Sequence, residues 1–360
     1  IRNENKGETF KPKEKTIRTI HQSTMDVKMI WRSPPRNVLV VKKPNDPESY
    51  SLFVDVTAWL REEPQCMNVI VEPLVHKELV SELKAVTHTW QESQFDMLHK
   101  SVDMVVCLGG DGTVIWVSNM FKGPCPPCIA FATGSLGFNT PFPASTFRHA
   151  LRRFISEGAV LSLRSRVNAA IIRCGEDANG CDKPAESDYA DLPTAMVALN
   201  EIVIDKGPQH QLTNLVVRCH DGTSGSLLTR VMADGLIIGT PTGSTAYSLA
   251  AGGPIVHPSV PAMLFTPICP HTLSFRPMIL PDHVTLSVEV PMESRATAWA
   301  AGDGKHRTEL RRGDRVVCRV SPFPLPFVCE SSERGDWLAA CTKSLSWNSR
   351  KEQKPHGPSL

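Results

Sequence analysis

The feature that most constrains the fold is an apolar run that ends in a glycine-rich turn and leads into a helical pattern. Residues 104–107 read Met-Val-Val-Cys, residues 108–113 read Leu-Gly-Gly-Asp-Gly-Thr, and residues 114–117 read Val-Ile-Trp-Val. Glycines let a backbone turn sharply, and the N–H groups at the start of a helix suit phosphate oxygens. The stretch therefore predicts a strand, a turn and a helix that together approach an anionic ligand.

The turn also carries a carboxylate, Asp111, which would be repelled by a bound phosphate. Asp111 makes sense at this position if its charge holds a metal ion or removes a proton. The alternative is a tight turn in which Asp111 only caps the following helix. The turn by itself does not decide between these interpretations.

Three further short apolar runs, at 37–41, 67–71 and 128–132, are typical of strands that are buried on both faces of a parallel sheet. Apolar residues at helical spacing lie between and after them, within 52–60, 79–86 and 147–155. We therefore predict a doubly wound, Rossmann-like α/β domain over residues 37–158, with ligands at the carboxyl ends of its strands. Residues 1–36 are charged and lack sustained periodicity, so we expect a flexible N-terminal segment.

After residue 158 the helical periodicity gives way to β-rich runs separated by turns. These runs are 160–163, 167–174, 196–204, 215–219, 284–290 and 315–320. They predict a second, mainly antiparallel β domain over 159–330, with an exposed loop at 175–194 and a hairpin turn at 220–223. A last helix is expected near 337–345 within the C-terminal segment 331–360, followed by a polar tail.

Composition limits the classes of partner. The 39 basic and 37 acidic residues leave a net charge of +2, which gives no general attraction to nucleic acid or to an anionic membrane. No apolar stretch of about 18 residues could span a bilayer. The 11 cysteines form no framework, and the single CxxC, Cys125 to Cys128, lacks a second ligand pair. We expect a cytoplasmic protein with reduced thiols; the chain starts with Ile1, so its native N-terminus is left open.

Two polar clusters interrupt the β-rich region. Asn200 and Glu201 stand in an otherwise apolar strand, where a carboxylate must be exposed, paired or used on a ligand. An adjacent amide and carboxylate suit the two vicinal hydroxyls of a ribose; the alternative is a strand end with one residue on each face. Asp303 lies between Gly302 and Gly304, and a plain hairpin turn is the favoured interpretation there.

The longest special segment, residues 234–254, combines a strand, a turn rich in glycine and hydroxyl groups, and a short helix of small residues. Small residues admit a flat ring, and the hydroxyls and helix N-terminus supply donors for a base, a ribose or a phosphate. The common nucleotide motifs are absent: there is no GxxxxGK[ST], no third glycine of GxGxxG, no protein-kinase catalytic loop and no HExxH.

The Gly-Gly-Asp-Gly-Thr turn alone is shared by NAD kinases, 6-phosphofructokinases and the diacylglycerol and sphingosine kinases. The ordered set of 109–113, 134–138 (Gly-Ser-Leu-Gly-Phe), 200–201, 234–235 and 242–248 (Thr-Gly-Ser-Thr-Ala-Tyr-Ser) resembles NAD kinases only. Residues 31–35 and 268–277 resemble the animal, cytosolic branch, and the similarity spans about residues 30–351. Asn139 departs from that branch, which usually has an apolar residue here, and this leaves the local shape of the adenine pocket open.

The resemblance implies transfer of the ATP γ-phosphoryl group to the 2′-hydroxyl of the NAD adenosine ribose, giving NADP, with Mg²⁺ or another divalent cation and with Asp111 as general base. It implies phosphate contacts at Gly109, Gly110, Gly112 and Thr113. It implies NAD contacts at Asp111, Gly112, Phe138, Asn200, Glu201, Asp234, Thr245, Ala246, Tyr247 and Ser248.

The resemblance also implies a C-terminal helix that packs on the first domain and a homo-oligomer, a dimer or tetramer. No metal ligand is identified. Two alternatives stay open: a lipid or sugar kinase with the same central turn, and a non-catalytic dinucleotide sensor.

Overall fold

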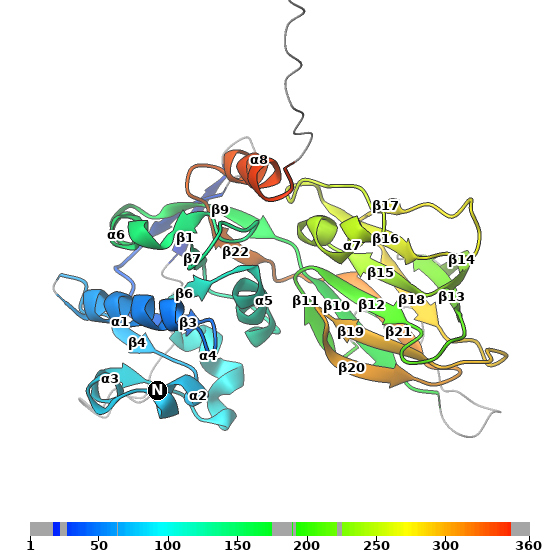
Figure 1. The fold of residues 1–360 in the computed structure, drawn as a ribbon, viewed down its shortest axis with the longest axis horizontal. Helices are drawn as coiled ribbons and strands as arrows, with labels where there is room; N and C mark the ends of the chain where they lie inside the picture. The colour runs from blue at the N-terminus through cyan, green and yellow to red at the C-terminus, as the bar shows by residue number, and fades with distance from the viewer. Residues whose placement is uncertain are drawn as a thin grey trace, which may run out of the picture.

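The computed structural model describes residues 17–21, 27–62, 64–174, 189, 192–221 and 225–346. An α/β part and a β-rich part lie side by side (Figure 1). The polar tail lies outside the described residues, as do most of the expected loop 175–194 and part of the expected hairpin turn 220–223. None of the described helices is long and apolar enough to cross a membrane.

The α/β part is built on one ten-stranded sheet in the order β1-β2-β9-β22-β7-β6-β3-β4-β5, with β8 beside β7. Neighbouring strands are parallel from β5 to β22 and antiparallel from β22 to β1. The strands are β1 (Ile17–His21), β2 (Val27–Trp31), β3 (Asn37–Lys42), β4 (Asn68–Ile70), β5 (Thr87–His88), β6 (Met104–Gly109), β7 (Cys128–Ala132), β8 (Phe142–Pro143), β9 (Ala159–Arg164) and β22 (Leu325–Val328).

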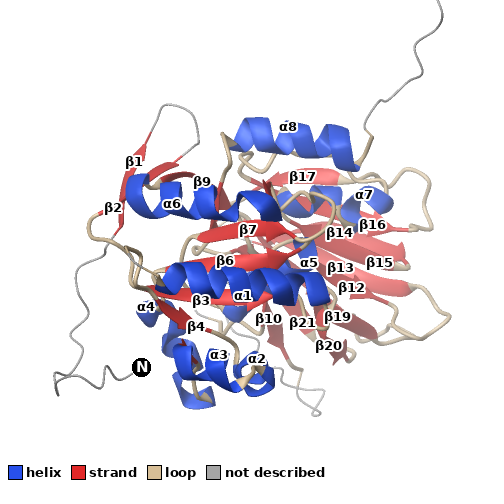
Figure 2. Ribbon diagram, turned by 60° about the vertical axis from the view of Figure 1, so that its left-hand side comes forward, coloured by secondary structure: helices blue, strands red, loops and turns tan. Residues whose placement is uncertain are grey.

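Helices cover both faces of this sheet (Figure 2). Val38 and Val40 of β3 face a core shared with α1 and α6, whereas Leu39 and Val41 face a core shared with α5. This alternation confirms the expected doubly wound α/β fold. The helices are α1 (Pro47–Arg61), α2 (Pro73–Glu78), α3 (Ser81–Val86), η1 (Glu92–Met97), α4 (Leu98–Ser101), α5 (Asp111–Met120), η2 (Ala144–Thr146) and α6 (Phe147–Glu157).

The order of the strands fixes where a ligand can enter. From β3 the chain continues to β4 on one side, and it returns to place β6 on the other side of β3. In open α/β sheets, ligands bind at such a switch point, outside the carboxyl ends of the two strands. Those ends are Lys42 of β3 and Gly109 of β6.

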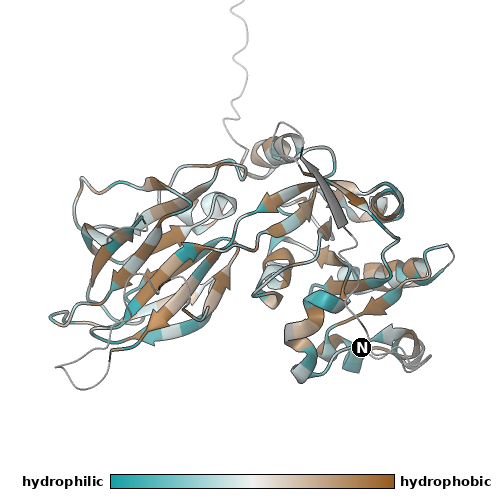
Figure 3. Ribbon diagram, turned by 180° about the vertical axis from the view of Figure 1, so that it is seen from behind, coloured by the Kyte–Doolittle hydropathy of each residue, from teal (hydrophilic) through white to brown (hydrophobic). Residues whose placement is uncertain are grey.

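The β-rich part is a sandwich of two six-stranded sheets whose facing sides share one apolar core. Apolar residues recur along the strands of both parts (Figure 3), and every strand pair within the two sheets is antiparallel, as expected. One sheet contains β11 (Met196–Ala198), β10 (Val167–Ile172), β21 (Arg315–Val320), β18 (Thr285–Glu289), β13 (Thr213–His220) and β14 (Gly225–Ala233). The other contains β17 (Met278–Pro281), β16 (Ala262–Ile268), β15 (Gly235–Gly239), β12 (Glu201–Asp205), β19 (Ala298–Gly302) and β20 (Lys305–Leu310).

Three local expectations differ from the structure. The run 196–204, expected as one strand, forms β11 and β12 in different sheets, because the backbone leaves the first ladder at Leu199 and Asn200. The helical pattern at 79–86 is divided, since Leu79 and Val80 have extended backbone angles between α2 and α3. The N-terminal segment, expected to be flexible, contains β1 and β2, because alternate residues Val27 and Met29 are buried against the sheet.

The first sheet also takes β9 and β22 from the range 159–330, which was expected to form the β-rich domain. The chain therefore crosses between the two parts twice, near residues 165–166 and 321–324. Arg166, fully buried at the first crossing, donates to the carbonyl of Phe323 at the second (2.7 Å). It also donates to the carbonyls of Ser118 (3.0 Å), Phe121 and Gly123 (2.7 Å) at the end of α5. One side chain thus ties both crossings to the helix that begins at Asp111.

The C-terminal helix α8 (Glu333–Ser344) lies against β9. The ring of Trp337 lies 4.8 Å from that of His257 in the β-rich part, between their centroids. Ser344 Oγ donates to the Leu136 carbonyl (3.3 Å). The helix therefore contacts both parts of the molecule.

Candidate active site

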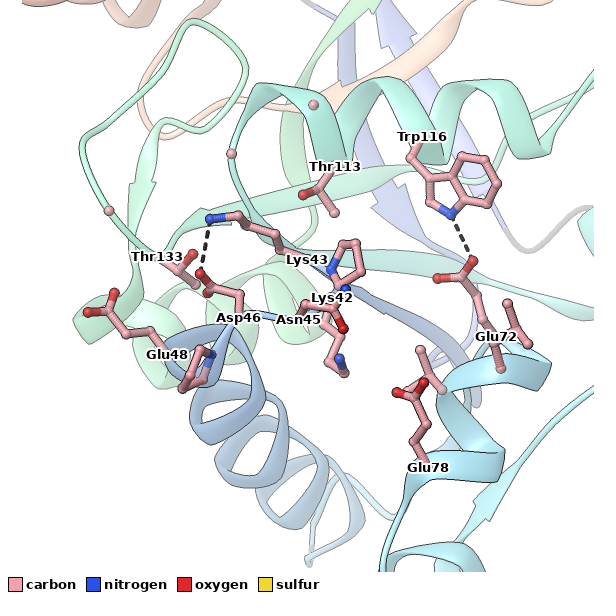
Figure 4. Close-up of a pocket in the computed structure, with 18 of the residues that line it drawn as sticks. Lys42, Lys43, Asn45, Asp46, Glu48, Glu72, Glu78, Thr113, Trp116 and Thr133 are labelled. Atoms are coloured by element: carbon pink, nitrogen blue, oxygen red, sulfur yellow. Dashed lines mark hydrogen bonds and ion pairs between the residues drawn. The ribbon is translucent and has the colours of Figure 1, made fainter. Parts of the chain in front are cut away.

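A cavity of about 1150 Å³ opens at the carboxyl ends of β3 and β6, where the topology predicts a ligand (Figure 4). Its wall includes Lys42 at the end of β3 and Lys43 directly after it, Glu72 and Glu78 at the two ends of α2, and Trp116 of α5. The lining also contains the expected phosphate residues Gly109, Gly110, Gly112 and Thr113. The structure therefore brings these four residues together in one cavity.

The three glycines of the turn 109–113 have different surroundings. A Cβ at Gly109 would lie 2.3 Å from Thr113 Oγ1, so this position must be glycine for the turn to close. A Cβ at Gly110 or Gly112 would have no protein atom within 4 Å, so their backbone faces open space. Gly110 is the N-cap residue of α5, and no side chain caps the helix, so its first N–H groups are left for a ligand.

Asp111 does not cap its own helix, which was the alternative interpretation. Its Oδ2 accepts from Phe138 N (3.1 Å), and its Oδ1 accepts from Asn139 N (2.9 Å). A Cβ at Gly137 would lie 2.3 Å from Asp111 Oδ1, so the loop 134–138 closes on the carboxylate only because this residue is glycine.

The environment of Asp111 favours its use as a base. Burial raises the pKa of this carboxyl group, while the N–H groups of Asn139 and Phe138 and the charge of Arg164 oppose the rise. A general base works best when its pKa approaches the operating pH. Burial therefore shifts the pKa of this carboxylate in the direction that proton abstraction requires.

Asn200 and Glu201 lie where the chain passes from β11 to β12. Glu201 is 7% exposed, and its Oε2 and Asn200 Oδ1 are buried without a hydrogen-bond partner among the residues that the structure describes. Burial, and then the charge of Asp303, raises the pKa of Glu201 to about 8. Buried polar atoms are almost always hydrogen-bonded, so these two are prepared for a ligand.

Asp303 has a larger role than the plain hairpin turn that the sequence favoured. It does lie in the turn between β19 and β20, with a φ of 46°. In addition, its carboxylate accepts from the N–H groups of Leu199 (2.8 Å), Asn200 (2.9 Å) and Glu201 (3.2 Å). Asp303 thus holds the strand break that positions the amide and the carboxylate.

The segment 234–254 packs against the same break from the other side. Thr240 Oγ1 donates to the Leu199 carbonyl (2.5 Å), and Thr240 N donates to the Asn200 carbonyl (2.8 Å). A Cβ at Gly243 would lie 2.3 Å from Asn200 O, so glycine allows η4 (Thr242–Thr245) to approach this close.

The other expected NAD residues differ in how open they are. Tyr247, at the start of α7 (Tyr247–Ala250), is 44% exposed, and Thr245 and Ala246 are half-buried. Ser248 is fully buried and shares a hydrogen bond with Thr266 Oγ1 (2.9 Å). Asp234 forms an ion pair with Lys206 (2.7 Å). The Phe138 side chain is half-buried, beside buried Asn139.

Sequence reasoning missed the cavity residues outside the glycine turns. The pair Lys42 and Lys43 directly follows the predicted strand 37–41, so its place at a strand's carboxyl end was the available signal. Glu72 and Trp116 gave no such signal. Trp116 Nε1 donates to Glu72 Oε1 (2.7 Å), and Lys305 Nζ lies 4.1 Å from the centre of the Trp116 ring.

Within the described ranges, no group of three or more histidine, cysteine, aspartate or glutamate side chains could hold a metal ion. The CxxC pair, Cys125 and Cys128, therefore has no third ligand beside it among the described residues. Burial raises the pKa of Cys125 to about 12 and raises the pKa of Cys128 well above its usual value. Both shifts disfavour the thiolate form, which is the form that binds metals.

A doubly wound domain has an open glycine turn at its switch point and is joined to a β sandwich that carries buried oxygens without a partner among the described residues; this arrangement defines a nucleotide-binding class of protein. Residues 38–160 match the ATP-NAD kinase N-terminal domain, and residues 199–329 match the ATP-NAD kinase C-terminal domain. The chain belongs to the NAD kinase family.

Relatives from plants and yeast agree with this assignment. The chain is 44% identical over 345 residues to a putative NAD kinase 3 of Oryza sativa subsp. japonica, covering 95% of this chain and 67% of the relative. It is 38% identical over 330 residues to an ATP-NADH kinase of Saccharomyces cerevisiae, covering 89% and 65%. For several other curated relatives the chain spans a third to three fifths of their length.

Solved structures show the same fold. Yeast NADH kinase complexed with NADH is similar with a TM-score of 0.80 and 31% identity, covering 95% of this chain and 96% of that one. An NAD kinase from Archaeoglobus fulgidus in complex with ATP has a TM-score of 0.59 and 20% identity, covering 85% and 98%.

Proposed function

We propose that the chain transfers the γ-phosphoryl group of ATP to the 2′-hydroxyl of the adenosine ribose of NAD, giving NADP. The observation that carries this proposal is the pair of buried, unpartnered oxygens on Asn200 and Glu201, which suits the hydroxyls of a ribose. Family membership and the open Gly-Gly-Asp-Gly turn support a phosphoryl donor in the adjoining cavity.

In the proposed reaction the chain mainly positions the substrates, because phosphoryl transfer depends on alignment and charge neutralisation. The backbone at Gly110 and Gly112 and the start of α5 bind donor phosphates. Asn200 and Glu201 hold the ribose. Asp111 accepts the proton of the 2′-hydroxyl as the oxygen attacks the γ-phosphorus, and ADP leaves with the electrons of the broken bond.

A divalent cation fits this donor cavity. Mg²⁺ is usually held by one or two carboxylates together with substrate phosphates and water. Four carboxylates line the cavity, those of Asp46, Glu48, Glu72 and Glu78; no three of them form a metal site by themselves, so one or two would hold the cation together with the donor phosphates. When bound, the cation would neutralise charge on the phosphate oxygens.

The remaining dinucleotide contacts follow the order of the chain. Phe138, Thr245 and Ala246 would line the adenine pocket, and Asp234, Tyr247 and Ser248 would serve the rest of NAD. The exposure of Tyr247 supports its part in this set. Ser248 and Asp234, which bond to Thr266 and Lys206, would act through these partners or exchange them for the ligand.

We also propose that the chain belongs to the animal, cytosolic branch of the family and forms a homo-oligomer. The assignment to this branch rests on residues 31–35 and 268–277. Assembly is supported by the outer strands of the sandwich, β14 and β17, which expose apolar side chains of Leu227 (54%), Met232 (51%) and Ile279 (51%). Exposed apolar edge strands favour pairing with another chain.

The deciding experiment incubates the chain with ATP, Mg²⁺ and NAD and measures NADP with an NADP-specific dehydrogenase. Matched reactions offer sphingosine, diacylglycerol or fructose 6-phosphate as acceptor. NADP formation with no product from the other acceptors is expected. Product from a lipid or sugar would establish the first alternative, and NAD binding without turnover would establish a dinucleotide sensor.

A further inference from the structure

The donor cavity has one basic side chain that comes from the β-rich part. The α/β part supplies residues of the glycine-bearing segments 109–113 and 133–135, residues of α2, and the two lysines at the carboxyl end of β3. Lys305, by contrast, is the first residue of β20. No other residue on the cavity wall, within the described chain, comes from the sandwich. Lys305 therefore reaches across from the part that carries the proposed NAD site.

The surroundings of Lys305 leave its charge available. Among the described residues, no carboxylate lies within ion-pair distance of its Nζ, which instead lies over the Trp116 ring. The Trp116 indole is in turn held by Glu72 Oε1. Partial burial lowers the pKa of Lys305, while the charges of Asp303 and Glu72 oppose this shift. A cation held over an aromatic face beside an anion-binding turn can exchange that contact for a phosphate oxygen.

The same turn also reaches the proposed acceptor site. Asp303, two residues before Lys305, accepts the N–H groups of Leu199, Asn200 and Glu201. A single short turn thus connects the strand break on one side with the donor cavity on the other.

We propose that Lys305 binds the polyphosphate of the donor nucleotide, leaving the Trp116 ring when the donor enters, and that it is the donor contact contributed by the β-rich part. This inference rests on the proposed function for the identity of the donor. The contact itself requires only a polyphosphate in the cavity.

The test measures direct binding by calorimetry, with ATP·Mg²⁺ and with inorganic tripolyphosphate, which lacks base and ribose. Lys305→Met keeps most of the hydrocarbon stem over Trp116, Lys305→Arg keeps the charge, and Lys122→Met is the control at an exposed lysine outside the cavity. A hydrogen bond between charged groups is worth enough to change affinity by about 10- to 100-fold. We expect Lys305→Met to weaken both ligands by this factor, with NAD affinity unchanged, and Lys305→Arg and Lys122→Met to stay near the parent.

Tripolyphosphate affinity within twofold of the parent in Lys305→Met would overturn the proposal, even if turnover fell. Equal losses in Lys305→Met and Lys305→Arg would also overturn it, because packing rather than charge would then matter. If the parent forms no NADP but its tripolyphosphate binding depends on Lys305, the proposed function fails and the donor contact stands.

Discussion

Asp111 has a structural role beside the catalytic role proposed for it. Each of its oxygens accepts one backbone N–H from the loop 137–139. A carboxylate has about four lone-pair sites, so two hydrogen bonds leave it able to accept a proton from a substrate hydroxyl. The same contacts fix the carboxylate within the turn 109–113.

Asp111→Asn should reduce the rate of NADP formation by about 10²- to 10⁴-fold, because the amide cannot accept the proton. The amide also has only one acceptor oxygen, so one of the two loop N–H groups loses its partner. Calorimetric NAD binding separates the two effects. A rate loss with affinity nearly unchanged supports a base, whereas an equal loss of affinity indicates that Asp111 only anchors the loop.

The raised pKa of Glu201 predicts how NAD affinity depends on pH. Its pKa of about 8 in the free protein means that it is protonated at pH 7, whereas ribose hydroxyls donate best to a carboxylate. NAD affinity should therefore rise from pH 7 to pH 9, and binding near pH 7 should release a proton. Calorimetry in buffers of different ionisation enthalpy measures that proton, and Glu201→Gln should show no such release.

The raised pKa also sets the sign of a stability change. Between about pH 4.5 and pH 8 the folded chain holds a proton on Glu201 that the unfolded chain has lost, so this group destabilises the fold as pH rises. Glu201→Gln should therefore increase the melting temperature more at pH 8.5 than at pH 5.5. An equal effect at both values would contradict the assigned pKa.

At the scale of elements, the break between β11 and β12 organises the β-rich side of the site. Three backbone N–H groups are held by Asp303, and the Leu199 and Asn200 carbonyls are held by Thr240. A strand that changed sheets without these partners would leave buried backbone groups unpaired. The polar side chains of Asn200 and Glu201 are therefore aimed by elements distant in sequence.

Asp303→Asn tests this arrangement. The amide oxygen can replace Oδ1, but its NH₂ group would face the N–H of Leu199, so unfolding free energy should fall by about 1–3 kcal/mol. The charge that raises the pKa of Glu201 also disappears, and the pH midpoint of NAD affinity should move lower. Asp282→Asn, in the turn before β18, is the control; an unmoved midpoint in Asp303→Asn would refute the coupling.

How far the sequence predicts the molecule depends on whether a signal is local. The apolar runs at 37–41 and 104–108 predict buried parallel strands, and the fold confirms them. The run 196–204 cannot reveal its break, because the partners that cause it lie at Thr240 and Asp303. The four glycine-turn residues expected at phosphate do share one cavity, whereas Glu72, Trp116 and Lys305 meet only through tertiary contacts.

For the whole molecule, Arg166 is a buried polar connection between the parts. It is fully buried, and its partners are carbonyl groups at the end of α5 and at the second crossing. Since Asp111 begins α5, Arg166 links the crossings between the parts to the helix that carries Asp111.

Arg166→Met should lower the free energy of unfolding by about 3 kcal/mol or more, because several carbonyl groups lose their donor at 1–3 kcal/mol each. Arg166→Lys should lie between the parent and the methionine variant. Urea unfolding measures both, with Arg152→Met on the exposed face of α6 as control. A loss below 1 kcal/mol in Arg166→Met would mean that the carbonyls find other partners.

The place of β22 has a consequence for how the chain is made. This strand lies between β9 and β7, yet it comes from residues 325–328, near the end of the chain. During synthesis the strands from β3 to β9 emerge from the ribosome long before the strand that joins them. Until then the nascent sheet exposes two unpaired edges, which are prone to wrong pairing. The emergence of β22, rather than of the strands that precede it, is the step at which the first sheet becomes whole.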